Sequence, residues 1–183
     1  MEELLDVLNE KGEYIGKFDT RANCHLHGLW HKAVVVFILD SEGQVLLQRR
    51  SLTKKLWPNM WDVTAGGHVL AGELGFQAVM RECQEELGIS ICKNELTFIG
   101  ATSSSTKNEH ILNNHINEYY VVIKNVDIST LIIQDAEVAE VKWISKNEII
   151  TKILNNCEGI TDKVGCWNYL IRYYEWSEQN RVL

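Results

Sequence analysis

Residues 66–89 read GGHVLAGELGFQAVMRECQEELGI, an apolar and acidic segment with the periodicity of a helix. Between residues 72 and 87 the apolar positions recur at the spacing of one helical face. They are Phe76, Val79, Met80, Cys83 and Leu87. Gly88 follows directly, where a glycine commonly ends a helix. The segment therefore predicts an amphipathic helix over residues 72–87.

Three glutamates share another face of this predicted helix. Glu82, Glu85 and Glu86 lie at positions i, i+3 and i+4, where like charges cost a few tenths of a kcal/mol per pair. A hard divalent cation would reverse that cost, because it prefers several oxygen ligands. Gly66 and Gly67 precede the helix as an expected loop, free to bring a carbonyl to a metal or an amide to a phosphate. An ordinary solvated acidic face is the alternative.

The whole segment resembles the Nudix box, G-x5-E-x7-R-E-U-x-E-E-x-G-U, where U is apolar. The matching residues are Gly67, Glu73, Arg81, Glu82, Cys83, Glu85, Glu86, Gly88 and Ile89. Seven of these positions require one residue type, so a chance match in one window is of order 10⁻⁸ to 10⁻⁹ at residue frequencies of roughly 5–7%. Cys83 is a mild departure, since a buried cysteine behaves as a small hydrophobe.

The resemblance implies a metal-dependent hydrolase. Its metal would be Mg²⁺, which Mn²⁺ can replace, held by the carbonyl of Gly66 and the carboxylates of Glu82, Glu85 and Glu86. Arg81 and Glu73 would orient those carboxylates, with plain surface charge as the alternative. Glu85 is the candidate for the indispensable ligand and a candidate for the general base, whose position varies within this superfamily.

The implied reaction is hydrolysis of a diphosphate linkage in a nucleoside diphosphate derivative or a related organic diphosphate. A bound Mg²⁺ would neutralise the non-bridging oxygens, polarise phosphorus and lower the pKa of a bound water. A nearby carboxylate would take the proton of that water.

The residues before the box resemble the isopentenyl-diphosphate-isomerase-like branch of the Nudix superfamily. WHKAVVVFILD (30–40) and VLLQRRSLTKKLWPNMWDVTAGGH (45–68) carry this likeness, which covers about residues 30–89. In the isomerases a cysteine immediately precedes the Gly-His pair and acts in double-bond migration, and the REUxEE core is degraded. Here that position is Gly66 and the core is whole, so hydrolysis is favoured over isomerisation.

A second alternative is a Nudix-fold module that binds a ligand without catalysis. Such modules commonly lose carboxylates of the box and carry an added DNA-binding domain. This chain keeps every carboxylate and has no basic segment for a helix-turn-helix unit.

The isomerase-like branch also implies a second metal site made of histidines and glutamates. The matching residues would be His31, His68 and Glu118. The N-terminal histidine of that site is uncertain, because His25 and His27 lie near its position while Cys24 has the better spacing. Hydrogen-bonded structural histidine is the alternative for His31 and His68.

Glu118 has a separate argument as a metal ligand. Nudix hydrolases often add a glutamate from a strand or loop downstream of the box. Glu109 is its rival in the polar stretch SSSTKNEHILNNH (103–115), and Ile116 replaces one glutamate of the isomerase pattern.

A basic cluster lies upstream of the box, at Arg49, Arg50, Lys54 and Lys55. Arginine offers planar bidentate contacts to phosphate and lysine a point charge. Arg50 and Lys54 are the first candidates for a diphosphate clamp, followed by Arg49 and His68. A solvated loop is the alternative. Nearby tryptophans, Trp57 and Trp61, could stack on a substrate or pack in the core.

Strands mixed with helices predict an α+β fold, an α/β/α sandwich with a mixed sheet between helices. An N-terminal hairpin is expected over about residues 1–28, turning around Gly12. Ser145 and Glu148 predict a capped helix to about residue 155, and a C-terminal helix covers about residues 161–178. Strands are expected at 32–39, 44–50, 61–65, 96–102, 118–123 and 138–144. Loops around residues 103–117 and the C-terminal helix are expected to recognise the substrate.

Composition limits the partners. The 183 residues fit a single domain, 1–183, with the box at 67–89, and the net charge of −7 disfavours nucleic acid and membrane surfaces. Five cysteines without a CxxC pair argue against disulfides and a structural zinc site. A cytoplasmic enzyme with a small-molecule diphosphate substrate is expected, with a homodimer possible through the hairpin or the aromatic C-terminal segment.

Overall fold

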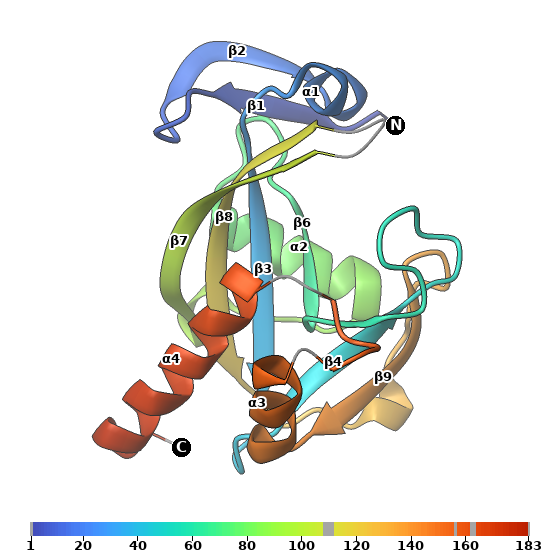
Figure 1. Ribbon diagram of the computed structural model, residues 1–183, viewed down its shortest axis with the longest axis vertical. Helices are drawn as coiled ribbons and strands as arrows, with labels where there is room; N and C mark the ends of the chain where they lie inside the picture. The colour runs from blue at the N-terminus through green and yellow to red at the C-terminus, as the bar shows by residue number, and fades with distance from the viewer. Residues whose placement is uncertain (1, 108–111, 156, 162–163, 183) are drawn as a thin grey trace.

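The computed structural model describes residues 2–107, 112–155, 157–161 and 164–182 (Figure 1). A mixed sheet of seven strands has the order β5 (Trp61–Asp62), β4 (Val45–Arg50), β3 (His31–Leu39), β8 (Leu112–Ile123) and β7 (Leu96–Lys107), with β6 (Ala65–His68) pairing with β3 and β9 (Val138–Ile144) with β4. Helices cover both faces of this sheet, as an α/β/α sandwich requires, and a separate two-stranded hairpin lies at one end (Figure 1). The predicted fold class is confirmed.

The central strand β3 (His31–Leu39) runs parallel to β8 (Leu112–Ile123) and antiparallel to β6 (Ala65–His68) and β4 (Val45–Arg50). From Ala33 to Leu39 its residues are all apolar, as expected of a strand buried on both faces. Alternate side chains enter two different cores: Val34, Val36 and Ile38 face α2, and Val35, Phe37 and Leu39 face α4.

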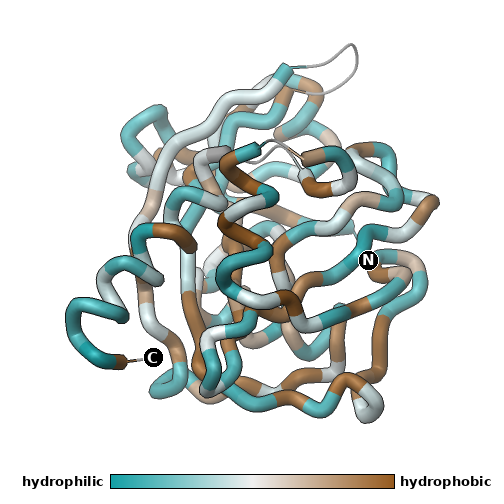
Figure 2. Tube along the Cα trace, turned by 60° about the horizontal axis from the view of Figure 1, so that its bottom comes forward, coloured by the Kyte–Doolittle hydropathy of each residue, from teal (hydrophilic) through white to brown (hydrophobic). Residues whose placement is uncertain are grey.

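The helical layers follow from these two cores. Helix α2 (Gly75–Leu87) covers one face, while α3 (Lys146–Leu154) and α4 (Val164–Asn180) cover the other. Ser145 caps α3 by accepting a hydrogen bond from the amide of Glu148, as predicted. Figure 2 shows long hydrophobic stretches along the strands and hydrophilic turns between them. None of the described helices is long and apolar enough to cross a membrane.

The N-terminal hairpin is confirmed as β1 (Leu4–Leu8) and β2 (Tyr14–Thr20). A short helix that the sequence analysis did not predict follows it, α1 (Arg21–His27). The hydroxyl of Thr20 caps its first turn, and Gly28 ends it with a φ of 61°. Its buried Cys24 packs with the hairpin in a small third core.

Two expected boundaries are wrong. The strand expected at 61–65 is two strands, β5 (Trp61–Asp62) and β6, and the glycines expected in a loop lie inside β6. There Gly66 pairs with Val35 and Gly67 with Val34.

The polar stretch 103–117 is largely strand rather than loop. It lengthens β7 (Leu96–Lys107) and β8 into a paired ribbon, with residues 108–111 outside the description. Strands pair through backbone hydrogen bonds, so an exposed ribbon tolerates polar side chains. Polarity alone therefore did not distinguish a strand from a loop here. The remaining elements are β9 (Val138–Ile144) and two 3₁₀ turns, η1 (Lys93–Glu95) and η2 (Ile128–Thr130).

Candidate active site

Helix α2 holds the acidic face in place. The side chain of Gln77 accepts a hydrogen bond from the amide of Leu74 at the start of the helix, and Gly88 ends it in the left-handed conformation, with a φ of 69°. Ala78, Val79 and Cys83 are fully buried against the sheet. The glutamates on the adjoining face are therefore turned toward β6 and β4.

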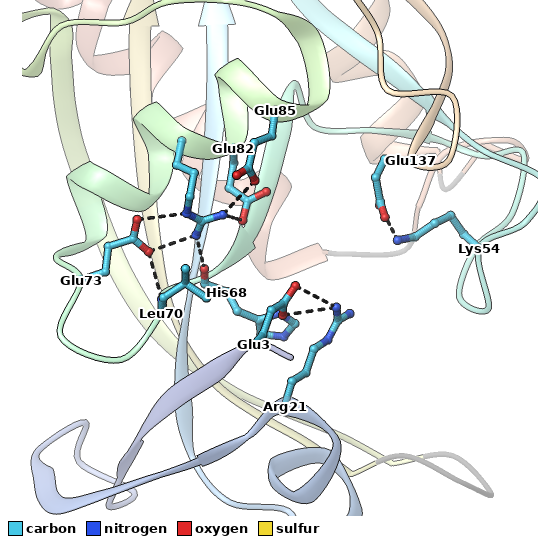
Figure 3. A network of polar contacts seen from close by, with 10 residues as sticks. Glu3, Arg21, Lys54, His68, Leu70, Glu73, Glu82, Glu85 and Glu137 are labelled. Carbon is cyan, nitrogen blue, oxygen red and sulfur yellow. Dashed lines mark hydrogen bonds and ion pairs between the residues drawn. The ribbon is translucent and has the colours of Figure 1, made fainter. Parts of the chain in front are cut away.

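Arg81 contacts three carboxylates, those of Glu73, Glu82 and Glu85. Figure 3 shows the three glutamates near one another. Its Nε and Nη2 donate to the two oxygens of Glu73 at 3.1 and 3.0 Å. Its Nη1 donates to Glu82 at 2.7 Å and to Glu85 at 3.1 Å. Nη2 also donates to the carbonyl of His68 at 2.8 Å, which joins α2 to β6. This geometry supports the predicted orienting role of Arg81 and Glu73.

The absence of a side chain at Gly67 leaves room for the carboxylate of Glu82. A Cβ atom at Gly67 would lie 2.1 Å from Oε1 of Glu82, so a side chain there would displace this carboxylate. The bare backbone of β6 thus forms a cradle in which this carboxylate lies. The neighbouring Gly66, whose carbonyl is a predicted ligand, is held in β6 beside Val34.

The three box glutamates differ in environment. Glu86 is 6% exposed, and Gln48 Nε2 donates to its Oε2 at 3.1 Å. Burial, together with the charge of Glu82, raises the pKa of Glu86 to about 8. Burial also raises the pKa of Glu82, opposed by Arg81. The side chain of Glu85 is 54% exposed.

These carboxylates fit a divalent cation. Taking an ionised carboxylate out of water costs several kcal/mol unless a cation or a full set of hydrogen bonds offsets the cost. The partner described for Glu86 is the neutral amide of Gln48, while Arg81 lies against Glu82 and Glu85. Carboxylate oxygens are the ligands that Mg²⁺ prefers.

The predicted diphosphate clamp is already paired with acids. Ion pairs join Arg49 to Glu140 at 2.6 Å, Arg50 to the buried Asp62 at 3.1 Å, and Lys54 to Glu137. Figure 3 shows Lys54 and Glu137 across from Glu82 and Glu85. Lys55 is exposed and has no ion pair among the described residues. A substrate role for this cluster stays a prediction. Trp61 lies beneath Lys142, whose Nζ is 4.1 Å from the ring centroid.

Glu118 is paired away from the other glutamates. Lys32 Nζ lies 2.8 Å from Oε1, and the hydroxyl of Tyr120 donates to Oε2 at 2.7 Å. Oε2 also lies beside Gly75, the first residue of α2. Glu82 follows seven residues later, about 10 Å along the helix axis. The role of Glu118 as a metal ligand stays a prediction. Its rival, Glu109, lies outside the described residues.

The second metal site expected at His31, His68 and Glu118 is corrected. His31 and His68 come together with His25 and His115, while Glu118 does not join them. The reason is strand alternation: residues 115 and 118 are an odd number apart on β8, so their side chains leave opposite faces of the sheet. Cys24, which had the better spacing, is buried in the hairpin core instead.

Position 66 has no room for the isomerase cysteine. A Cβ atom there would lie 2.6 Å from the carbonyl oxygen of Val34. The cysteines nearest in sequence, Cys24 and Cys83, are fully buried, and burial raises the pKa of both thiols.

The sequence analysis did not identify three residues of the site. Gln48 contacts Glu86 from β4, Glu137 adds negative charge near Glu86 from the segment before β9, and Glu3 lies 3.6 Å from His68. Each belongs to a segment outside the box, so spacing carried no signal. Gln48 could have been found as a lone polar residue that ends the apolar run VLL.

Comparison with known proteins agrees with this geometry. A family model described as the NUDIX domain matches residues 29–162. An uncharacterised Nudix hydrolase of Listeria monocytogenes is 36% identical over 144 residues, 79% of this chain and 80% of that protein. An isopentenyl-diphosphate Delta-isomerase of Escherichia coli is 31% identical over 137 residues, 75% of this chain and 74% of that protein.

A solved structure supports the fold. DR0079 from Deinococcus radiodurans has a TM-score of 0.66 at 24% identity, covering 93% of this chain and 98% of that one. At this identity the likeness is evidence for the fold alone.

Proposed function

The chain belongs to the Nudix family, and from that premise we propose that it hydrolyses the diphosphate linkage of a small organic diphosphate with Mg²⁺ held by Glu82, Glu85 and Glu86. The observation that carries the proposal is the buried Glu86 carboxylate, whose described partner is a neutral amide, beside the second carboxylate of Glu82. Hydrolases of this family act on pyrophosphate bonds.

The three carboxylates would have different roles in the reaction. Mg²⁺, when bound, neutralises the phosphate oxygens, polarises phosphorus and lowers the pKa of a coordinated water. Glu86 and Glu82 provide fixed, largely desolvated charge on the protein side. Glu85 is the most exposed of the three and can accept the proton of the attacking water.

Arg81 would keep the carboxylates in register during turnover. Its two hydrogen bonds to Glu73 and one to the carbonyl of His68 fix the guanidinium independently of Glu82 and Glu85. Glu82 and Glu85 would therefore be available to hold a cation without loss of the position of Arg81. Arg81 would return to the same position each time, because Glu73 still holds it.

The substrate would be a small anionic molecule, and basic residues after β4 would bring positive charge close to it. Lys55 is the exposed cation there, and Lys54 is held beside the site by Glu137. The acidic net charge of −7 supports neither nucleic acid nor a membrane surface as the substrate.

A Mg²⁺-dependent hydrolysis screen tests the proposal. The panel contains nucleoside triphosphates, nucleotide sugars, ADP-ribose, dinucleoside polyphosphates, CoA and isoprenyl diphosphates. With the best substrate, Glu85→Gln is expected to lower kcat by about 10³-fold, or ~4 kcal/mol of transition-state stabilisation. Glu10→Gln, at an exposed glutamate of the hairpin turn, is the matched control and should retain wild-type activity.

Two results would overturn the proposal. Equal product release by wild type and Glu85→Gln would remove the role of the box carboxylates. Double-bond migration in isopentenyl diphosphate by the wild type would assign the chain to isomerase chemistry, which Gly66 opposes.

A further inference from the structure

A glutamine is buried beside the box carboxylates, on a strand that faces them. Gln48 lies on β4 and is 4% exposed. It follows Leu46, which packs in the core under α2, by two residues, so strand alternation turns its side chain toward the same helix. Its neighbours in the sheet are Asp62 on β5 and Val141 on β9. The amide therefore projects toward α2 from a strand that is paired on both sides.

The two ends of the Gln48 amide differ in their contacts. Nε2 donates to Oε2 of Glu86 at 3.1 Å, whereas Oε1 is buried and has no hydrogen-bond partner among the described residues. Exchange of the two ends would set Oε1 against a carboxylate oxygen, and both atoms are acceptors. A buried acceptor without a partner costs free energy, so stability alone would favour an apolar residue at this position. The free oxygen instead points to a ligand that donates a hydrogen bond.

A water coordinated to a cation is such a donor. Its lone pair is directed at the cation, so both of its hydrogens are available, and Mg²⁺ usually keeps several waters when a protein binds it. A carboxamide oxygen accepts a hydrogen bond without adding charge. Glu82 and Glu137 already add negative charge near Glu86. A neutral acceptor at residue 48 therefore suits the site better than a further carboxylate, which would increase the repulsion.

We propose that Gln48 is a positioning residue of the metal site, which holds the Glu86 carboxylate through Nε2 and accepts a hydrogen bond from a coordinated water through Oε1. The inference rests on the proposed function in one respect, the divalent cation at the box glutamates. Gln48 acts through Glu86 and does not touch the reacting phosphorus. By fixing one ligand in a single orientation, it raises the affinity for the cation before substrate binds.

Metal binding without substrate tests this contribution. The full-length protein is freed of metal and titrated with Mn²⁺, and the unbound Mn²⁺ is followed by its EPR signal. Gln48→Met keeps the length and approximate volume of the side chain and removes the amide. We expect its Mn²⁺ affinity to fall by roughly 10- to 100-fold, as loss of an outer partner of a metal ligand does. Mg²⁺ should compete for the same site in both proteins.

Two further measurements separate positioning from a purely structural role. The Mg²⁺ concentration that half-activates hydrolysis should rise by roughly 10- to 100-fold, while KM for the substrate at saturating Mg²⁺ stays within about twofold. The Tm of metal-free Gln48→Met in EDTA should change by less than about 4 °C, because the variant removes an unpaired buried oxygen together with the donor. A purely structural glutamine would give the reverse, a lower Tm with unchanged Mn²⁺ affinity.

A second glutamine provides the matched control. Nε2 of Gln44 donates to Oδ2 of Asp40 at 2.9 Å, the same contact of amide with carboxylate, just before β4 begins. Gln44→Met should bind Mn²⁺ as the wild type does. Gln48→Asn retracts the amide by one methylene group and keeps a polar side chain. It should lose at least about tenfold in affinity, and it tests the inference if Gln48→Met fails to fold.

The coupling between Gln48 and Glu86 separates this inference from the function on which it rests. In a Glu86→Gln background, Gln48→Met should lower Mn²⁺ affinity by about threefold or less, because the ligand that it orients is gone. Wild-type Mn²⁺ affinity in both Gln48 variants would overturn the inference and leave the proposed hydrolysis intact, as would an equal loss with and without Glu86. The expected differences in affinity, without hydrolysis of any substrate in the panel, would overturn the proposed function alone. A wild type that binds no Mn²⁺ would overturn both.

Discussion

The acidic face of α2 and the histidine cluster are built in opposite ways. Glu82, Glu85 and Glu86 are neighbours in sequence, and the pitch of one helix brings them together. The cluster of His25, His31, His68 and His115 spans ninety residues. Its members meet only because β6 and β8 pair with β3 and α1 supplies His25. A site within one helix is visible as a motif, while a site across strands depends on the whole fold.

Glu86→Gln should have the largest effect and tests the acidic face of α2. We expect Mg²⁺-dependent hydrolysis to fall by about 10³-fold, ~4 kcal/mol. The Tm of the metal-free protein should not fall, because an amide replaces a buried carboxyl group whose ionised form costs free energy without a cation, in keeping with its raised pKa. Hydrolysis assays and thermal unfolding in EDTA measure both. Wild-type hydrolysis by Glu86→Gln would contradict the proposed role of Glu86 as a metal ligand.

Arg50→Ala should lower the free energy of unfolding by about 3 kcal/mol, because it leaves Asp62, 1% exposed, without its cation. Denaturant unfolding measures the loss. Glu140→Gln, which removes the half-exposed partner of Arg49, is the control and should cost under about 1 kcal/mol. A stable Arg50→Ala protein with a greatly raised KM would instead favour the clamp role.

Gly67→Ala tests the cradle under Glu82. The added methyl group must displace a carboxylate that lies 2.1 Å from its position, so kcat should fall by roughly 10- to 100-fold, ~1.4–2.7 kcal/mol. Gly165→Ala, in α4 with open space around the new methyl group, should leave activity unchanged and stabilise slightly. Wild-type kcat in Gly67→Ala would contradict the placement of Glu82.

Lys55→Ala should have the smallest effect. We expect KM to rise about two- to fivefold, under ~1 kcal/mol, with kcat unchanged, since an exposed lysine contributes uniform binding of an anionic substrate. Steady-state kinetics at low and high salt provide the measurement, and the difference should shrink at high salt. Lys11→Ala, on the hairpin turn, is the control. A loss in kcat would place Lys55 nearer the reacting phosphate than proposed.

Local pattern accounts for the parts of the fold that the sequence predicted. The apolar run of β3, the stripe of α2 ended by Gly88, and the Ser145 cap of α3 each depend on residues within one turn or strand. The box likewise named Arg81 and Glu73, which the structure joins by two hydrogen bonds.

Polarity and spacing gave wrong predictions where tertiary contacts determine the local structure. Residues 103–107 are polar yet form a strand, because β8 supplies their hydrogen-bond partners. Helix α1 is only seven residues long, too short to be stable by itself, and it depends on Cys24 packing under the hairpin. The resemblance to the isomerases implied Glu118 as a partner of His31 and His68, but the alternation of side chains along β8 places His115 beside them instead.

The sequence by itself determined the family, the helix that carries the box carboxylates and the chemistry those carboxylates support, because all of these reside in short-range spacing. Only the tertiary structure decided how deeply Glu86 is buried, that the basic cluster is paired with acids, and that four distant histidines face one another. Burial and cross-strand register are properties of packed surfaces, which no single segment of the chain contains.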